Sequence, residues 1–374
     1  MPSMNLDQEK IRSLKALLDT AREVVVVAHT HPDGDALGST AALSLYLREQ
    51  LGKQVTCILP DTPPENLDFL RAPSVPYLFN DKAPREAAAT IQKADMIVLL
   101  DCNAFSRTEG LQKALEDSPA VKILIDHHLN PDSGSFRLVF STPEISSASE
   151  LLYWVLKAMV PENTPSGAFA RTEPPRKLEI SGDPGWSRSD AEEGVFSGTI
   201  GMSLMAGMTT DTNNFANSVY PSTFRMASEL IAAGVDRDAL LEKLYQSYRE
   251  NRVRLMGYMQ NEGLHLLEEG AAYMILTKEI QDRFNLKDGE SEGLVNVPLT
   301  IRKVRLSVLL KEDGDHFRVS VRSKKGTSAQ NLAQRFFHGG GHENAAGGKL
   351  FPGQDFTPGK ADEFLRQTLK DYLR

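Results

Sequence analysis

The sequence predicts an α/β protein of two domains: an N-terminal domain with a doubly wound, mostly parallel sheet, and a smaller α+β domain, joined by a helical linker. In the first half, the apolar runs EVVVVAHT, QVTCILP, DMIVLLD and VKILIDHH alternate with helical stretches. Uninterrupted apolar runs indicate strands covered on both faces. From Ala271 onward the pattern changes to strands, a hairpin turn at Asp313-Gly314 and a helix. The length of 374 residues is enough for two hydrophobic cores.

We expect the first domain to span residues 1–250, the linker residues 251–270, and the second domain residues 271–374. A long helix over residues 237–263 would run from one domain toward the other. Residues 161–194 are rich in Pro, Gly, Ser and charge without periodicity, which indicates a surface insertion.

Composition narrows the classes of protein that fit. The hydrophobic content of 41% and charged content of 25% are those of a globular chain. No apolar run has the length of a signal peptide core or a membrane span, so we expect no membrane partner. Two cysteines without a CxxC pair favour the reducing cytoplasm. A net charge of −8 disfavours long nucleic acid but allows a short anionic ligand at a locally positive site.

Three predicted strands end in ionisable side chains. His29 follows VVVVA, Asp101 follows MIVLL, and Asp126-His127-His128 follow KILI. Ligands of open α/β sheets bind at the carboxyl ends of the strands. The three strand ends therefore predict one common site.

The stretch HTHPDGD contributes His29, Asp33 and Asp35. In isolation it is also compatible with an ordinary strand-to-helix turn that Asp35 caps. Together with Asp101, His127 and Asp211, it gives two histidines and four aspartates, an inventory that suits two divalent ions about 3.5–4 Å apart. Oxygen and imidazole ligands favour Mn²⁺, Mg²⁺ or Fe²⁺, and Asp101 is the candidate bridge between the ions.

Such a centre needs groups that bind phosphate. The candidates are His128, Arg322, His342 and the glycine run Gly339, Gly340 and Gly341, whose backbone N–H groups could approach an anion. A flexible turn is the alternative interpretation of the glycine run. His31 is interpreted as a bystander and Lys324-Lys325 as a solvated pair. Arg107 suits a phosphate contact or a structural ion pair about equally well.

Five motifs in order make the chain resemble the DHH phosphoesterase family with a DHHA1 C-terminal domain: HTHPDGDALGS, LLDCNAFSR, LIDHH, TTDTNNF and RFFHGGGHENAAGG. The resemblance implies one metal at His29, Asp33 and Asp101, and the other at Asp35, Asp101, His127 and Asp211. It implies manganese as the usual ion, His128 on the scissile phosphate, and Arg322, Ser323 and His342 as substrate-binding residues. Relatives often carry glycine where this chain has Asn213 and His338.

Within this family, the chain resembles the NrnA-like branch of oligoribonucleotidases and 3′-phosphoadenosine-5′-phosphate (pAp) phosphatases. This resemblance implies a cytoplasmic hydrolase of pAp and short oligoribonucleotides, and family members are often homodimers. The alternatives are hydrolysis of linear or cyclic dinucleotides, an exopolyphosphatase-like activity, and a non-catalytic nucleotide-binding protein. The complete set of six proposed ligands argues against the last alternative.

Overall fold

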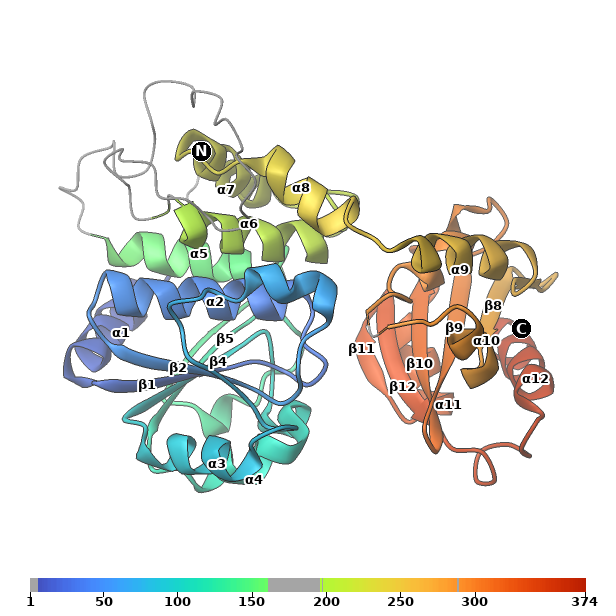
Figure 1. Cartoon of the computed structure of the whole chain (residues 1–374), viewed down its shortest axis with the longest axis horizontal. Helices are drawn as coiled ribbons and strands as arrows, with labels where there is room; N and C mark the ends of the chain where they lie inside the picture. Colours follow the sequence, from blue (N-terminus) through green and yellow to red (C-terminus); the bar gives the residue numbers. More distant parts are fainter. Residues whose placement is uncertain (1–5, 161–195, 197, 288) are drawn as a thin grey trace. The chain divides into compact units, whose positions relative to one another are not determined.

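The computed structural model describes residues 6–160, 196, 198–287 and 289–374, which form two compact units, Met1–Ser247 and Tyr248–Arg374. The insertion predicted at residues 161–194 lies outside the described residues. Each unit has its own sheet and core (Figure 1).

The first unit is built on a six-stranded sheet in which every pairing is parallel, in the order β3-β2-β1-β4-β5-β6. Its strands are β1 Glu23–Val27, β2 Gln54–Leu59, β3 Tyr77–Phe79, β4 Met96–Leu100, β5 Val121–Asp126 and β6 Leu138–Ser141. The chain moves outward from β1 in one direction and from β4 in the other, which confirms the doubly wound prediction. Adjacent β1 and β4 therefore flank the topological switch point, where ligands bind in such sheets.

Helices cover both faces of this sheet (Figure 1). The helices of the unit are α1 Gln8–Thr20, α2 Gly34–Glu49, α3 Pro84–Lys93, α4 Gln112–Asp117, α5 Ala148–Met159, α6 Gly198–Asp211, α7 Pro221–Ala232 and α8 Arg237–Tyr245, with 3-10 turns η1 Glu65–Leu70, η2 Phe105–Leu111 and η3 Ser133–Ser135. Alternate residues of β1 enter different cores: Val24 and Val26 pack with α1, α2 and α5, whereas Val25 and Val27 pack with α3 and α4. This double burial explains the unbroken apolar runs of the sequence.

Helices α2 and α6 pack closely because Gly38 of α2 lies against the backbone of α6. A Cβ on Gly38 would lie 2.5 Å from the Ser203 carbonyl oxygen and 2.9 Å from the Gly207 nitrogen. Every residue of α2 from Gly34 to Leu47 is buried. This packing fixes the first turn of α2, which carries Asp35, beside the last turn of α6, which carries Asp211.

Two features of the first unit differ from the sequence prediction. The edge strands β3 and β6 were not predicted, because three or four residues are too few to show a hydrophobic pattern. The single long helix predicted over residues 237–263 was wrong, since α8 ends at Tyr245 and α9 begins at Glu250. Leu244 of α8 packs in the core of the first unit and Leu255 of α9 in a core of the second. The two helices thus pack in the cores of different units.

The second unit contains a mixed six-stranded sheet in the order β11-β12-β10-β9-β8-β7. Its strands are β7 His265–Leu266, β8 Ala271–Leu276, β9 Leu306–Asp313, β10 His316–Ser323, β11 Gly340–His342 and β12 Ala345–Leu350. Strands β9 and β10 form the predicted hairpin, in which Asp313 pairs with His316 and Gly314 adopts φ 65°. Strand β8 pairs parallel to β9, which makes the sheet mixed.

Helices also cover both faces of this second sheet: α9 Glu250–Asn261, α10 Lys278–Arg283, η5 Leu294–Thr300, α11 Ala329–Phe336 and α12 Ala361–Leu373. Leu255 of α9 and Leu294 of η5 pack on one face, and Leu332 of α11 and Leu365 of α12 on the other. Among the described residues, no helix combines the length and apolar character that crossing a membrane requires.

Candidate metal centre

The residues predicted to bind metal come together at the carboxyl ends of β1, β4 and β5. His29 lies two residues after β1, Asp101 directly follows β4, and His127 directly follows β5. The loops after β1 and β4 diverge at the switch point of the sheet and leave room there for a ligand. The N-cap of α2 adds Asp33 and its first turn adds Asp35, and the last residue of α6 is Asp211.

The loop after β1 is shaped by two aspartates. Asp33 is the N-cap of α2, and its Oδ1 accepts hydrogen bonds from Asp35 N at 3.0 Å and Ala36 N at 3.1 Å. The cap is therefore Asp33, and the alternative in which Asp35 caps the helix is wrong. Asp61 accepts hydrogen bonds from Thr30 Oγ1 at 2.5 Å and His31 N at 2.6 Å. These bonds hold the loop in place, including His31 at a φ of 53°.

Asp101 lies at the centre of the site. Its side chain is buried, and its Oδ2 lies 3.4 Å from His29 Nε2 while its Oδ1 lies 3.4 Å from His127 Nε2. Three groups of potential ligand atoms, each within 4.8 Å, share this residue: His29, Asp33 and Asp101; Asp35, Asp101 and His127; and Asp101, Asp126 and His128. In the third group, Asp126 and His128 already pair with each other. Asp211 Oδ2 extends the second group, 3.5 Å from His127 Nε2. Asp101 is thus placed where one carboxylate can serve two cations.

The charges of the site favour cations. Burial alone would raise the pKa of Asp101, but His127 and His29 hold it well below its usual range. Burial would likewise lower the pKa of both histidines, yet the neighbouring carboxylates outweigh it. They raise the pKa of His29 to about 9 and that of His127 to about 10. The carboxylates therefore favour the protonated, positively charged form of both imidazoles. Divalent ions could replace these protons.

Asp35 is buried and bound by a helix terminus. Its Oδ2 accepts a hydrogen bond from Ala148 N at 2.7 Å, and its Oδ1 accepts one from Ser149 N at 2.9 Å. Both donors lie in the first turn of α5. Burial, followed by the charges of Asp101 and Asp211, raises the pKa of Asp35 well above its usual value. A cation beside Asp35 would remove the cost of keeping this carboxylate ionised.

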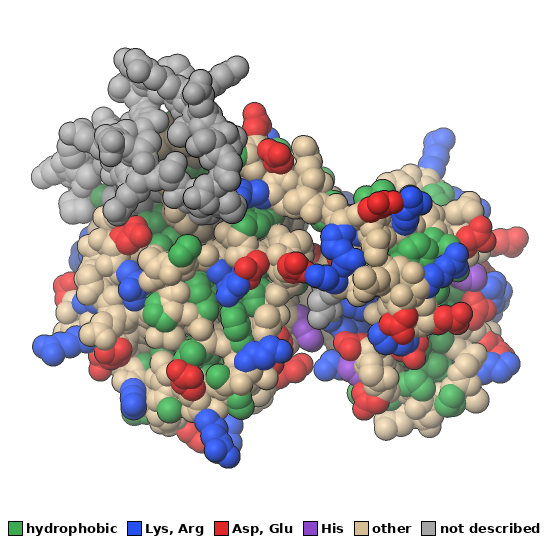
Figure 2. Space-filling view, in the orientation of Figure 1, with side chains coloured by type: hydrophobic (Ala, Val, Ile, Leu, Met, Phe, Trp, Pro, Cys, Tyr) green, Lys and Arg blue, Asp and Glu red, His purple; other side chains and the backbone are tan. Residues whose placement is uncertain are grey.

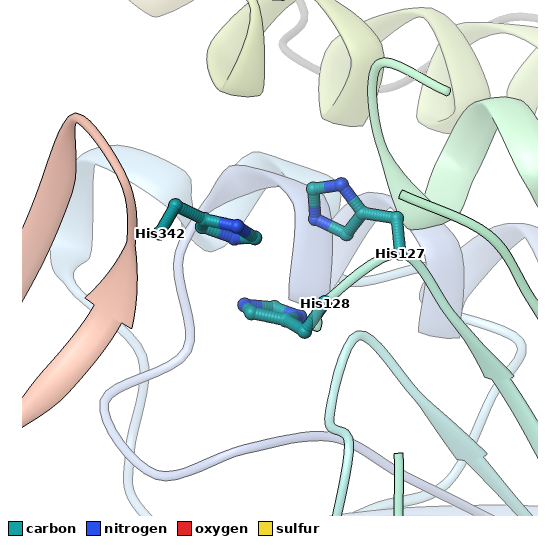
Figure 3. Close-up of side chains that lie close together, drawn as sticks. All are labelled: His127, His128 and His342. Atoms are coloured by element: carbon teal, nitrogen blue, oxygen red, sulfur yellow. The ribbon is translucent and has the colours of Figure 1, made fainter. Parts of the chain in front are cut away.

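His127 and His128 project from the end of β5 with their rings at a 66° angle and 4.8 Å between centroids (Figure 3). The buried Asp126 accepts hydrogen bonds from His128 N at 3.0 Å through Oδ2 and pairs through Oδ1 with His128 Nδ1 at 2.7 Å. Asp126 thus fixes the orientation of the His128 ring through Nδ1. Sequence reasoning gave Asp126 no role; its position inside a motif of ionisable residues was the available signal.

The predicted substrate-binding residues lie in the second unit. Arg322 and Ser323 end β10, and Arg322 Nη1 donates to the Val321 carbonyl oxygen at 3.0 Å. The Ser323 hydroxyl donates to Thr327 O at 2.6 Å and accepts from Asn344 Nδ2 at 3.0 Å, so both bonds serve the local fold. His342, drawn on its strand in Figure 3, pairs with Ala345 across β11 and β12.

The glycine run is largely a strand, in contrast to the predicted loop. Gly340 and Gly341 belong to β11 at the sheet edge, where Gly340 pairs with Gly347 and Gly341 with Ala346. A Cβ on Gly339 would collide with the backbone of Gly347, and one on Gly341 would lie 2.6 Å from Ala345 O. Close packing of strands explains these two glycines. Gly340 has open space around its Cα, so the local packing does not account for it.

Comparison with known proteins identifies the family of this chain. Residues 23–175 match the DHH family, N-terminal domain, and residues 271–374 match the DHHA1 domain. The crystal structure of an exopolyphosphatase-related protein from Bacteroides fragilis is 33% identical, with a TM-score of 0.83 and coverage of 100% of this chain and 98% of that one. The chain belongs to the DHH family.

Two curated relatives are similar over nearly their whole length. The bifunctional oligoribonuclease and PAP phosphatase NrnA of Bacillus subtilis is 28% identical over 92% of this chain and 93% of its own. The probable enzyme of the same name from Streptococcus mutans is 26% identical over 97% and 99%.

The two positions at which the family resemblance leads us to expect glycine share one backbone property. Asn213 adopts φ 47°, and so does His338. Left-handed backbone favours glycine, and asparagine and histidine are among the other residues that tolerate it best. His338 also pairs with Asp355 Oδ1 at 2.7 Å. Both departures therefore preserve the local backbone.

The residues present fit a pair of divalent ions. Asp101 Oδ1 is buried and makes no hydrogen bond to any described residue, which a metal ligand atom explains. The clustered donors are carboxylate oxygens and imidazole nitrogens, and neither Cys57 nor Cys102 belongs to a cluster of potential ligands in the described part of the chain. Such donors suit Mn²⁺ or Mg²⁺ better than a thiolate-bound ion.

A second carboxylate that sequence reasoning missed holds the helix terminus that binds Asp35. Glu150 of α5 is fully buried and accepts from four neutral donors: Ser146 N at 3.1 Å, Ser146 Oγ at 2.5 Å, Thr223 Oγ1 at 2.7 Å and Trp154 Nε1 at 3.2 Å. These bonds fix the start of α5 and tie it to α7. That start carries the two N–H groups that bind Asp35. A polar residue in the run SSASE was the only signal in the sequence.

Proposed function

We propose that this chain is a metal-dependent phosphoesterase that hydrolyses short oligoribonucleotides and the 3′-phosphate of pAp. The observation that carries the proposal is that Asp101 is shared by the group with His29 and Asp33 and the group with Asp35 and His127. The bifunctional NrnA relatives, similar over more than nine-tenths of both chains, support the substrate class.

In this proposal, His29, Asp33 and Asp101 hold one ion, and Asp35, Asp101, His127 and Asp211 hold the other. What a pair of divalent ions supplies there is a water of lowered pKa and positive charge beside the reacting phosphoryl group. Mn²⁺ is the proposed ion, because the donors are a mixture of carboxylates and imidazoles.

The surrounding residues position the substrate. Asp126 pairs with His128 Nδ1 and orients the ring, and Nε2 is the nitrogen proposed to contact an oxygen of the scissile phosphate. Arg322, Gly339, Gly340, Gly341 and His342 bind the part of the substrate that does not react, Arg322 through its guanidinium. The Ser323 hydroxyl contributes mainly by holding the turn after β10, given its two internal hydrogen bonds.

A substrate panel tests the proposal. The purified chain is assayed with Mn²⁺ on pAp, di- to pentaribonucleotides, linear and cyclic dinucleotides, polyphosphate and long single-stranded DNA, and ranked by kcat/KM. We expect pAp and the di- to pentaribonucleotides to rank ahead of the other substrates, and excess chelator to abolish turnover.

A second candidate is polyphosphate hydrolysis, favoured by the 33% identical Bacteroides fragilis structure described as exopolyphosphatase-related. The same panel separates the two. Release of inorganic phosphate from polyphosphate at a higher kcat/KM than any nucleotide would replace the leading proposal with this one.

A further inference from the structure

The second unit gathers five cationic residues at one end of its sheet: Arg302, Lys303, Arg305, Lys324 and Lys325, called here the basic patch. Arg302, Lys303 and Arg305 precede β9, whereas Lys324 and Lys325 follow β10. The antiparallel pairing of the two strands joins the segments, and Lys324 N donates to Arg305 O at 2.9 Å. The sequence showed only an adjacent lysine pair, and the fold adds three more cations to it.

Carboxylates of the described residues do not neutralise the charge of the basic patch. Arg305 Nη2 donates to the carbonyl oxygens of Glu269 and Leu373, at 3.4 Å and 3.3 Å, and Lys324 Nζ donates to Ile301 O at 2.9 Å. Within the described chain, none of the five forms an ion pair with a carboxylate, although many other lysines and arginines of the unit do. Arg302, Lys303, Arg305 and Lys325 are exposed.

The distribution of charge between the two units points the same way. Residues 248–374 contain 20 Lys and Arg against 17 Asp and Glu, whereas residues 1–247 contain 22 against 33. The second unit is therefore net positive within a chain of net charge −8. In the view of Figure 2, both signs are interspersed over its visible face, so the excess does not form one broad basic field. The exposed cations without acidic partners are the natural place for an anion.

We propose that the basic patch binds the backbone phosphates of an oligoribonucleotide beyond the nucleotides held by Arg322 and His342, and so sets a preference for substrate length. This inference rests on the proposed function for the identity of the ligand. The patch continues directly from Arg322 along the chain, since Lys324 and Lys325 follow Ser323 at the end of β10. A dinucleotide has too few phosphates to use both sets of contacts, whereas a pentanucleotide has enough.

The test is a triple substitution, Arg302→Gln, Lys303→Gln and Lys325→Gln, which spares the two cations that bind backbone carbonyls. The matched control is Arg254→Gln, Lys278→Gln and Lys360→Gln, which removes the same charge from the same unit at residues paired with Glu250, Asp282 and Glu363. Binding of fluorescent penta- and diadenylate to each full-length chain is measured in chelator across a salt series.

The patch variant should bind pentaadenylate about 10-fold more weakly than the control does and diadenylate about equally. For pentaadenylate, the slope of log Kd against log salt concentration should be smaller in the patch variant than in the control. The difference should be roughly 0.7 for each phosphate that the patch no longer neutralises, about 2 in all. Equal pentaadenylate affinity in the two variants would overturn the inference. Polyphosphate of matched charge is measured in the same way, and a loss of affinity confined to it would also overturn the inference and assign the patch to that anion.

Hydrolysis of the same oligonucleotides by the unmodified chain with Mn²⁺ separates this inference from the proposed function. If pentaadenylate binding depends on the basic patch but no oligonucleotide is hydrolysed, the proposed function is contradicted and the binding role of the patch stands. If short oligonucleotides are hydrolysed but the patch variant binds them as well as the control does, only the binding role of the patch is overturned.

Discussion

Asp126 and His128 form a part-buried carboxylate–imidazole pair, with Asp126 Oδ1 2.7 Å from His128 Nδ1. Asp126 itself is fully buried, and its second oxygen accepts the His128 backbone N–H at 3.0 Å. One carboxylate thus fixes both the ring and the backbone of the residue proposed to contact the scissile phosphate.

Asp126→Asn should lower kcat by roughly 100-fold with little change in KM, because the amide disturbs the orientation and tautomer of His128 in the reaction more than it disturbs substrate binding. Steady-state kinetics on pAp with saturating Mn²⁺ provide the measurement. Asp95→Asn is the matched control, since Asp95 accepts two backbone N–H groups, from Arg22 and Glu23. A kcat of Asp126→Asn equal to that of the control would remove Asp126 from the mechanism.

Glu150→Gln should weaken Mn²⁺ binding by about 10-fold, because changes to residues that orient metal ligands usually cost 10- to 100-fold in affinity. Either orientation of the new amide sets its NH₂ against a donor, Ser146 N–H or Trp154 Nε1–H. The start of α5 would then shift under Asp35. Titration calorimetry with Mn²⁺, without substrate, measures the affinity.

Tyr153→Phe is the control for Glu150→Gln, because it removes a hydrogen bond from the same helix to Glu229 of α7. Both variants should lose thermal stability, but only Glu150→Gln should lose Mn²⁺ affinity. Parallel losses of Mn²⁺ affinity in the two variants would mean that Glu150 stabilises the fold without positioning Asp35.

Metal binding should release protons. In the metal-free chain, carboxylates raise the pKa of His29 to about 9 and of His127 to about 10, from 6.5. Metal ligation requires neutral imidazoles, so Mn²⁺ affinity should rise from pH 6.5 toward 9. The raised pKa values stabilise the metal-free fold fully below pH 6.5, and this contribution is lost as the pH rises through 9 and 10.

Calorimetry of Mn²⁺ binding at pH 7.5, in two buffers of different ionisation enthalpy, counts the protons released. We expect more than one proton per chain. Binding without proton release would show that His29 and His127 are not the ligands, or that they are neutral before the metal binds.

Arg322→Ala and His342→Ala should each raise KM for pAp by about 10-fold and leave kcat within a few-fold, because the proposed contacts hold a phosphate that does not react. Arg318→Ala is the matched control: Arg318 lies on the same face of β10, four residues before Arg322, and its Nη1 is 4.0 Å from Asp313 Oδ2. An unchanged KM in both test variants would refute the substrate-binding role of these residues.

The sequence predicted those parts of the fold and site that leave a local pattern. The central strands β1, β2, β4 and β5 are unbroken apolar runs, and polar residues at their ends mark His29, Asp101 and His127. The edge strands and the break between α8 and α9 left no such pattern, because the packing of each unit decides them. Contacts remote in sequence, such as Glu150 with Thr223 and Asp35 with Ala148, could not be predicted for the same reason.

The glycine run shows how one pattern permits two structures. Consecutive glycines suit a phosphate-binding loop and equally suit close strand packing. The contacts of Gly339 with Gly347 and of Gly341 with Ala345 show that packing decides two of the three positions.

The central claim is that Asp101 bridges two ions, and electron paramagnetic resonance of the Mn²⁺-loaded chain tests it most directly. Asp101→Asn is the variant of choice, because Asp101 adopts φ 52° and asparagine tolerates this backbone. We predict two Mn²⁺ per unmodified chain with a spin-coupled signal, and loss of the coupling with at least about a 1,000-fold loss of turnover in the variant. A single uncoupled Mn²⁺ in the unmodified chain, or full coupling and turnover in the variant, would contradict the claim.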